Sequence, residues 1–243
     1  MNIAVIFAGG VGRRMHSKDR PKQFLNMYNK PIIIHTIDQF ERHPLIDAIV
    51  VVCVEGWMAY LMELLDQYRI KKVKQVVPGG ETGQLSIYNG LKAAENVAGQ
   101  QESIVLIHDG VRPLINEKLI TDNIETVKKY GSAITTAKVK ETILVVEESE
   151  STIDYIPSRN NSRVAKAPQS FWLKDILNAH EKALSEGEKD FIDSCTMMQY
   201  YGYKLHLIDG PNQNIKITTP EDFFMARTIL EIKENDQLYG LDD

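Results

Sequence analysis

Residues 2–12 read NIAVIFAGGVG, an apolar run that ends in three glycines. A short apolar run bounded by glycines predicts a buried strand, here Ile3–Phe7. Because glycine has no Cβ, the chain can turn sharply after the strand and bring its backbone N–H groups close to a phosphate. The glycines therefore indicate either a phosphate-binding loop or an ordinary tight turn into a helix.

Apolar runs alternate with longer helix-like stretches along the rest of the chain. This alternation predicts an α/β fold with a mostly parallel sheet covered by helices on both faces. The expected strands are Ile3–Phe7, Ala48–Val54, Lys74–Val77, Ser103–Ile107, Ser132–Ala137, Lys204–Ile208 and Ile215–Ile217. The expected helices are Pro31–Arg42, Trp57–Tyr68, Gly83–Asn96, Glu117–Tyr130, Lys174–Glu186, Phe191–Tyr201 and Pro220–Glu234, the last capped by Thr219.

The segment Lys138–Lys166 interrupts the alternation. It holds two short strand-like pieces, Thr142–Val146 and Thr152–Ile156, on either side of an acidic turn. A segment of about 30 residues is too short to be stable as a separate domain. We expect one domain over residues 1–243, with a protruding β-arm at about 138–166.

Composition excludes several classes of protein. With 28 basic and 33 acidic residues among 243, the net charge is −5, which argues against a general nucleic-acid-binding role. The longest apolar run, Ala48–Val54, is far shorter than the ~20 residues of a membrane span. No leader-like segment precedes Ile3, so we expect a cytoplasmic protein. Cys53 and Cys195 match neither a disulfide framework nor a zinc site and are expected to pack in the interior.

Basic residues are concentrated behind the glycines, at Arg13, Arg14, Lys18, Arg20 and Lys22. Clustered cations repel one another unless water or an anion surrounds them. Proline before Lys22 and apolar residues after it should hold this lysine in place, which favours a bound polyphosphate. The pattern differs from the dinucleotide fingerprint and from the P-loop, which require other residues at these positions.

Other expected strands also end in residues that suit a nucleotide. Gly80 and Ser86 follow one strand, Asp109 and Arg112 follow another, and Lys216 lies in an apolar frame near the C-terminus. Each has a structural interpretation as well: an ordinary helix start, an Asp–Arg pair or an outward-facing lysine. In open α/β sheets, ligands bind beyond the carboxyl ends of the strands. Since an aspartate there can hold Mg²⁺ beside a phosphate, the residues together predict a nucleotide–Mg²⁺ site.

Five motifs carry a resemblance to a known family: AGGVGRRM…PKQF, GGETGQLSIYNGL, HDGVRP, APQSF and NIKITTPED. From Ile3 to about Ile232 the chain resembles the cytidylyltransferases that act on 2-C-methyl-D-erythritol 4-phosphate or ribitol 5-phosphate. The resemblance implies a Rossmann-like nucleotidyltransferase fold with a β-arm. It also implies a reaction of CTP with a polyol phosphate, with Mg²⁺ as cofactor and pyrophosphate as a product.

The resemblance also implies roles for individual residues. The catalytic residues would be Arg14, Lys22 and Lys216. The nucleotide would be bound by Ala8, Gly9, Gly10, Gly12, Gly80, Glu81, Ser86 and Asp109, with Asp109 also the metal ligand. The polyol phosphate would be bound by Arg112 and, through the β-arm of the second subunit of a homodimer, by Thr142 and Arg159.

Two positions depart from the family pattern. Gly83 replaces a usual arginine, and Ala167 replaces a usual threonine. Both changes bear on the choice of acceptor more than on the reaction. The forms AGG, HDGVRP and IPSR favour ribitol 5-phosphate, and the methylerythritol phosphate enzyme of isoprenoid biosynthesis is the alternative.

The predicted reaction needs no general base, because the attacking phosphate oxygen is already anionic. Fixed cations and Mg²⁺ stabilise the charge that develops. This explains the absence of a Ser–His or Cys–His pair, and His108 is expected to be a buried residue at the end of a strand. A non-catalytic nucleotide-binding regulator and a dehydrogenase are the remaining alternatives. Pyrophosphate release from CTP and tight NADH binding would distinguish them.

Overall fold

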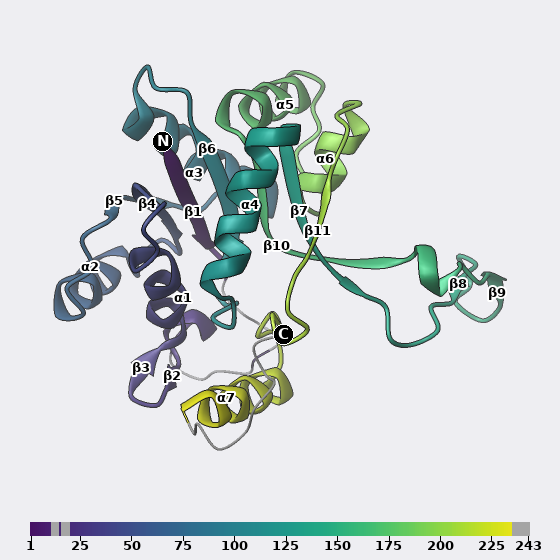
Figure 1. Ribbon diagram of the computed structural model, residues 1–243, viewed down its shortest axis with the longest axis horizontal. Coiled ribbons are helices and arrows are strands. Elements are labelled where there is room, and N and C mark those ends of the chain that lie inside the picture. The colour runs from purple at the N-terminus through teal and green to yellow at the C-terminus, as the bar shows by residue number, and fades with distance from the viewer. Residues whose placement is uncertain (11–14, 16–19, 235–243) are drawn as a thin grey trace.

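The computed structural model describes residues 1–10, 15 and 20–234, and a seven-stranded sheet forms its centre. The strand order is β11-β7-β10-β6-β1-β4-β5 (Figure 1). The strands are β1 (Asn2–Ala8), β4 (Ala48–Cys53), β5 (Val73–Pro78), β6 (Ile104–Asp109), β7 (Ser132–Lys138), β10 (Arg163–Trp172) and β11 (Leu207–Asp209). Neighbours pair in parallel except β10, which is antiparallel to both β6 and β7, so the predicted mostly parallel sheet is confirmed.

Helices cover both faces of this sheet. They are α1 (Ile32–Glu41), α2 (Met58–Gln67), α3 (Gly83–Ala98), α4 (Glu117–Tyr130), α5 (Leu173–Ser185), α6 (Ser194–Tyr200) and α7 (Pro220–Glu234). Successive residues of a strand point to opposite faces. In β1, Ala4 and Ile6 therefore join the core beneath α1, α2 and α4, whereas Ile3 and Val5 join the core beneath α3, α5 and α6.

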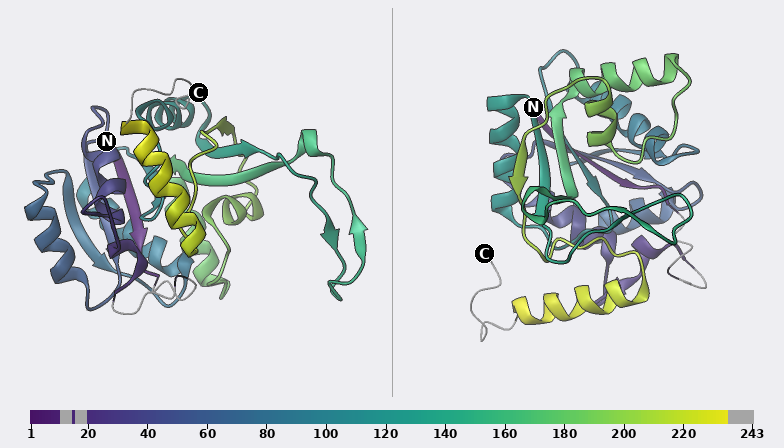
Figure 2. Two further views of the ribbon diagram at one scale, coloured as in Figure 1. Left: turned by 90° about the horizontal axis from the view of Figure 1, so that it is seen from below. Right: turned by 90° about the vertical axis from the view of Figure 1, so that its right-hand side faces the viewer.

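Helix α7 belongs to neither of these two layers. It packs in a third apolar cluster with Met27 and Val111, through Ala226 on its own inner face. Figure 2 shows it lying across the end of the sheet. The Thr219 hydroxyl accepts the N–H of Asp222 at 3.4 Å, and the Asp222 carboxylate accepts the N–H of Thr219 at 2.9 Å. This reciprocal cap confirms the predicted helix start.

Short elements complete the body. The turn after the first loop contains η2 (Lys22–Phe24) and a small hairpin of β2 (Asn26–Met27) and β3 (Lys30–Pro31). None of the helices in the described part of the chain has the length and hydropathy needed to cross a membrane.

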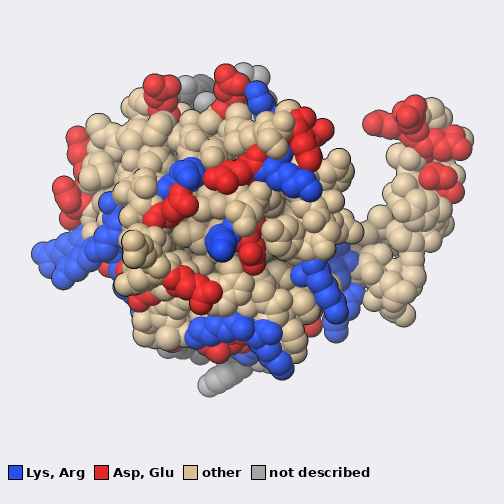
Figure 3. Space-filling view, turned by 90° about the horizontal axis from the view of Figure 1, so that it is seen from above, with Lys and Arg blue, Asp and Glu red and all other residues tan. Residues whose placement is uncertain are grey.

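Strands β7 and β10 continue beyond the body as an extension that ends in β8 (Val145–Val146) and β9 (Ile153–Tyr155), with η3 (Arg159–Asn161) between β9 and β10. We call residues 139–162 the arm. Figure 1 shows it leaving the body on the side of β7 and β10. Acidic side chains gather at its tip in Figure 3. It also exposes apolar side chains, namely Ile143, Leu144, Val146, Ile153, Tyr155 and Ile156.

Three expected elements differ in the structure. The segment Ile215–Ile217 is not a strand, because its backbone hydrogen bonds do not form a ladder: the N–H of Ile217 donates to Val111 O at 3.0 Å, and the N–H of Ile215 donates to the nearby Gln213 O at 2.7 Å. Strand β11 begins only at Leu207, and α6 begins only at Ser194, where Asp193 caps it. The sequence prediction also missed β10, a strand in the interior of the sheet.

Candidate functional site

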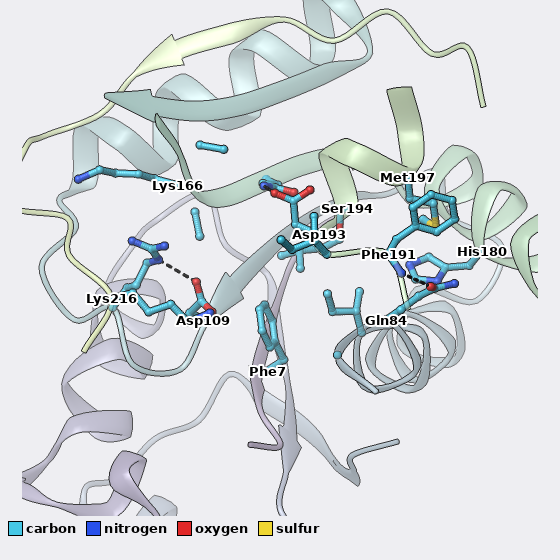
Figure 4. Close-up of a pocket in the computed structure, with 18 residues that line it drawn as sticks. Phe7, Gln84, Asp109, Lys166, His180, Phe191, Asp193, Ser194, Met197 and Lys216 are labelled. Carbon is cyan, nitrogen blue, oxygen red and sulfur yellow. Dashed lines mark hydrogen bonds and ion pairs between the residues drawn. The ribbon is translucent and has the colours of Figure 1, made fainter. Parts of the chain in front are cut away.

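The side chain of Asp109, at the carboxyl end of β6, holds two cations. Its Oδ2 lies 2.7 Å from Arg112 Nε, and its Oδ1 lies 2.6 Å from Lys216 Nζ (Figure 4). Burial acts to raise the pKa of Asp109, but the charges of Lys216 and Arg112 outweigh it and hold the pKa at about 2. The carboxylate is therefore ionised at neutral pH, and the three groups together carry one net positive charge.

Backbone contacts bring Lys216 and Lys22 to the same place. Arg112 Nη1 donates to Asn214 O at 3.0 Å, which fixes the segment before α7 beside the end of β6. Lys22 Nζ donates to Ile217 O at 2.9 Å. Of the two predicted catalytic lysines, Lys216 thus lies in this segment and Lys22 donates to the residue that follows it.

Two glycine turns face each other at the carboxyl ends of β1 and β5. A Cβ atom on Gly9 would lie 3.2 Å from Ser86 Oγ and 3.5 Å from Gly79 Cα. A Cβ on Gly80 would lie only 2.5 Å from the Cβ of Leu85, so no larger residue fits there. Gly9 therefore allows the two turns to approach closely, and Gly80 allows its own turn to pack against the start of α3.

Polar side chains hold these turns in shape. Gln23 Nε2 donates to Ala8 O at 2.7 Å and to Gly10 O at 3.3 Å. The Ser86 hydroxyl accepts the N–H of Gly80 at 3.0 Å and donates to Thr82 O at 2.9 Å. Gln23 is a functional candidate that the sequence analysis missed, although it stands next to Lys22.

Most of the predicted site residues meet at this end of the sheet. Those brought together are Ala8, Gly9, Gly10, Lys22, Gly80, Ser86, Asp109, Arg112 and Lys216. Glu81 is exposed on the turn before α3. Thr142 and Arg159 are exposed on the arm, away from the others. Gly12 and Arg14 lie outside the described residues.

A cavity of about 290 Å³ opens beside Asp109. Residues of β10, the strand missed from sequence, form one wall of it, among them Lys166, Ala167 and Gln169. Gly83, at the start of α3, lies on another wall. Both departures from the family pattern, Gly83 and Ala167, thus face this cavity.

Lys166 adds a third cation to the cavity wall. Its Nζ donates to Asn212 O at 3.0 Å and to Asn214 O at 3.1 Å. Burial, together with the charges of Arg112 and Lys140, lowers the pKa of Lys166 to about 8. An anion bound beside Lys166 and Arg112 would relieve this repulsion. Only recognition of β10 as a strand would have indicated Lys166 from the sequence.

Asp193 lies farther along the cavity and fixes the start of α6. Its Oδ1 accepts the N–H of Thr196 at 2.8 Å, and its Oδ2 accepts Gln169 Nε2 at 3.1 Å. Burial acts to raise the pKa of Asp193, but the hydrogen bonds from Thr196 and Gln169 outweigh it and lower the pKa. Asp193 is therefore a second ionised carboxylate on the wall.

His108, Cys53 and Cys195 have structural roles and are not catalytic candidates. His108 is fully buried, and its Nε2 lies 3.0 Å from Arg112 O. Burial lowers the pKa of His108 to about 4. Burial likewise raises the pKa of Cys53 to about 11 and that of Cys195 to about 12. Neither thiol is an activated nucleophile.

Comparison with known proteins reveals relatives along the whole chain. The family model described as "IspD: 2-C-methyl-D-erythritol 4-phosphate cytidylyltransferase" matches residues 2–232. The chain is 54% identical over 241 residues to the ribitol-5-phosphate cytidylyltransferase of Streptococcus agalactiae serotype V, covering 99% of this chain and 100% of the relative. It is 39% identical over 230 residues to the 2-C-methyl-D-erythritol 4-phosphate cytidylyltransferase of Clostridium botulinum strain Langeland, covering 95% and 97% of the two chains.

A solved structure shares the fold. It is the 4-diphosphocytidyl-2C-methyl-D-erythritol synthase of Anaerococcus prevotii, with a TM-score of 0.81 and 29% identity, covering 95% of this chain and 96% of that one.

Proposed function

Because the chain belongs to the IspD family of cytidylyltransferases, we propose that it transfers the cytidylyl group of CTP to ribitol 5-phosphate, forming CDP-ribitol and pyrophosphate. The main support for ribitol 5-phosphate as the acceptor is the similarity over the full chain to relatives named ribitol-5-phosphate cytidylyltransferase, which are identical to this chain at more than half of the aligned residues. Relatives named 2-C-methyl-D-erythritol 4-phosphate cytidylyltransferase are identical at about two-fifths of the aligned residues.

The two parts of the site suit the two substrates. The glycine turn at Gly9 and Gly10 would bring backbone N–H groups to the triphosphate of CTP, and the turn at Gly80, whose own N–H donates to Ser86, packs against it. The cavity next to Asp109 has room for a small acceptor, and Arg112 and Lys166 supply charge for its phosphate. The reacting groups would therefore meet near Asp109, Lys22 and Lys216.

In the reaction, a bond forms between an oxygen of the acceptor phosphate and the α-phosphorus of CTP. The bond between that phosphorus and the oxygen that bridges to the β-phosphate breaks, and pyrophosphate leaves. Two anions must approach in line, so the main work of the protein is positioning and charge stabilisation. Lys22 and Lys216, held by Ile217 O and Asp109, are the described cations placed for this role. Arg14 is proposed for the same role from the family resemblance.

Asp109 would hold the Mg²⁺ ion. Mg²⁺ is commonly bound by one or two carboxylates together with substrate phosphates, and the ionised carboxylate of Asp109 meets that requirement. The bound ion would neutralise charge on the triphosphate. Arg112 and Lys216 keep Asp109 in place for it.

The proposed assembly is a homodimer in which each arm reaches the site of the other subunit. Thr142 and Arg159 are exposed on the arm, which projects from the body on the side of β7 and β10 (Figure 1). The exposed apolar residues of the arm also favour burial against a second copy. The use of CTP favours action in the cytoplasm, and nothing in the acidic net charge supports a nucleic-acid partner.

The proposal is tested by incubating the protein with CTP, Mg²⁺ and one acceptor at a time while pyrophosphate release is measured. Ribitol 5-phosphate is expected to give a higher kcat/KM than 2-C-methyl-D-erythritol 4-phosphate. The reverse order would assign the chain to the alternative acceptor. No release with any polyol phosphate would contradict the enzyme activity and favour a nucleotide-binding regulator.

A further inference from the structure

The two ends of the cavity differ in charge. Lys166, Lys216 and Arg112 lie at one end, beside Asp109. The other end is formed by uncharged side chains, among them Gln84, His180 and Ser194, and Figure 4 shows them on the opposite side of Asp193 from the lysines. An occupant that matches both ends has an anionic group at one end and a neutral polar group at the other.

Polar atoms at the neutral end are buried without partners. Ser194 is 3% exposed and His180 is 1% exposed. Within the part of the chain that the structure describes, neither Ser194 Oγ nor either ring nitrogen of His180 has a hydrogen-bond partner. Burial of such groups without partners is costly, so most of them in native proteins are satisfied. These three unsatisfied polar atoms belong to two residues that line one cavity, which points to a polar ligand there.

The neighbouring amides cannot satisfy these groups. Gln84 Oε1 accepts the N–H of Phe191 at 2.8 Å, and its Nε2 donates to Glu188 O at 3.0 Å. The amide of Gln169 is engaged in the same way, by Asp193 and by the N–H of Cys195. These two glutamines hold the walls of the cavity, and His180 and Ser194 are left for an occupant.

The chemistry of the two free groups matches a hydroxyl. Burial lowers the pKa of His180 to about 4, so the ring is neutral at pH 7 and offers one donor and one acceptor. Its ring stacks on Tyr88 at 5.6 Å between centroids, which fixes its plane. A serine hydroxyl also both donates and accepts. A second phosphate or carboxylate would find no cation at this end.

We propose that His180 and Ser194 bind the hydroxyl groups of the acceptor that are farthest from its phosphate. The inference rests on the proposed function and extends it, because it assigns recognition of the carbon chain to two residues. The phosphate would lie at the cationic end, and the alditol chain would extend past Asp193 to the neutral end. Longer polyol phosphates would then be preferred over shorter ones.

The test compares Ser194→Ala and His180→Phe with the wild type. Loss of one hydrogen bond is expected to raise the KM for ribitol 5-phosphate about 3- to 10-fold in each variant. Glycerol 3-phosphate carries the same phosphate on a shorter chain, so its inhibition constant against ribitol 5-phosphate should stay unchanged. The KM for CTP should also stay unchanged. The melting temperature of Ser194→Ala should not fall, since the lost hydroxyl has no protein partner.

The matched control is Ser103→Ala, which removes a buried serine hydroxyl that donates to Gln101 O at the other end of β6. It should leave the KM for ribitol 5-phosphate unchanged. If Ser194→Ala does the same in an active enzyme, the inference is wrong, whatever happens to the fold of His180→Phe. An equal rise in the KM for ribitol 5-phosphate and in the inhibition constant of glycerol 3-phosphate would also overturn the inference.

Failure of the proposed function gives a different result. If the wild type reacts only with 2-C-methyl-D-erythritol 4-phosphate, the acceptor proposed above is wrong, and the same comparison is made with that substrate. If no acceptor reacts, calorimetric titration of wild type and Ser194→Ala with ribitol 5-phosphate replaces the kinetics. Weaker binding by the variant would then support the inference, and equal or absent binding would overturn it.

Discussion

At the scale of single residues, Asp109 holds together two cations that come from different parts of the chain. Arg112 lies three residues later, whereas Lys216 comes from the segment before α7. A buried carboxylate with two charged partners is stabilised only while it is ionised. Its protonation therefore affects the fold as well as the site.

We expect Asp109→Asn to change how stability depends on pH. The pKa of Asp109 is about 2 in the folded protein and near 3.8 when unperturbed. A depressed pKa stabilises the fold above the unfolded value, and this contribution is lost as pH falls from about 4 to about 2. Measured by chemical unfolding, the free energy of unfolding of the wild type should fall by roughly 2 kcal/mol more than that of the variant across this pH range. The exposed control Asp66→Asn should behave like the wild type, and identical curves for Asp109→Asn would contradict the prediction.

Lys22→Ala should reduce turnover with little effect on the fold. Removal of one preorganised charge contact to a transition state costs on the order of 2.7–4 kcal/mol of barrier, or about 10²- to 10³-fold in kcat. Pyrophosphate release measures the loss. Lys74→Ala, which removes an exposed lysine of β5, is the matched control. A Lys22→Ala enzyme within a few-fold of the control would exclude the proposed role.

At the scale of elements, the sequence predicted helices most accurately where a capping side chain defines the start of the helix. Helices α4 and α7 have the predicted bounds, because Asn116 caps one and Thr219 the other. Strand β10 lacked such a signal. Its Lys166, Pro168 and Gln169 break the apolar pattern, and its place is set by pairing with β6 and β7, far away in sequence. Missing β10 also meant missing one wall of the cavity.

Helix α3 offers a paired test of packing. A Cβ on Gly90 would lie 2.6 Å from Val5 Cγ1 and 2.7 Å from Val52 Cγ2, both in the core of the sheet. Gly90→Ala should therefore lower the free energy of unfolding by about 1–3 kcal/mol. A Cβ on Gly83, at the start of the same helix, meets nothing within 4 Å, so Gly83→Ala should not lower the free energy of unfolding. Urea unfolding of both variants checks this prediction, and an equal free energy of unfolding for the two variants would contradict it.

At the scale of the whole molecule, the proposed site is shared between two copies of the chain. Arg159 would act in one subunit and Lys22 in the other. Coexpression of Lys22→Ala with Arg159→Ala should then restore activity that neither variant has alone, to about a quarter of wild type if subunits mix at random in a symmetric dimer. Light scattering gives the oligomeric state independently. A monomer, or no recovery in proven mixed dimers, would contradict the shared site.

The order of strands in the sheet has a consequence for synthesis of the protein. Strand β10 separates β6 from β7, yet it follows both in the chain. While residues 139–172 are being added, the apolar β6 lacks β10, its partner on that side in the folded protein. At 5–20 residues per second this interval lasts about 2 to 7 s. For that time the nascent chain presents an open strand edge, which is a surface for chaperone binding or aggregation on the ribosome.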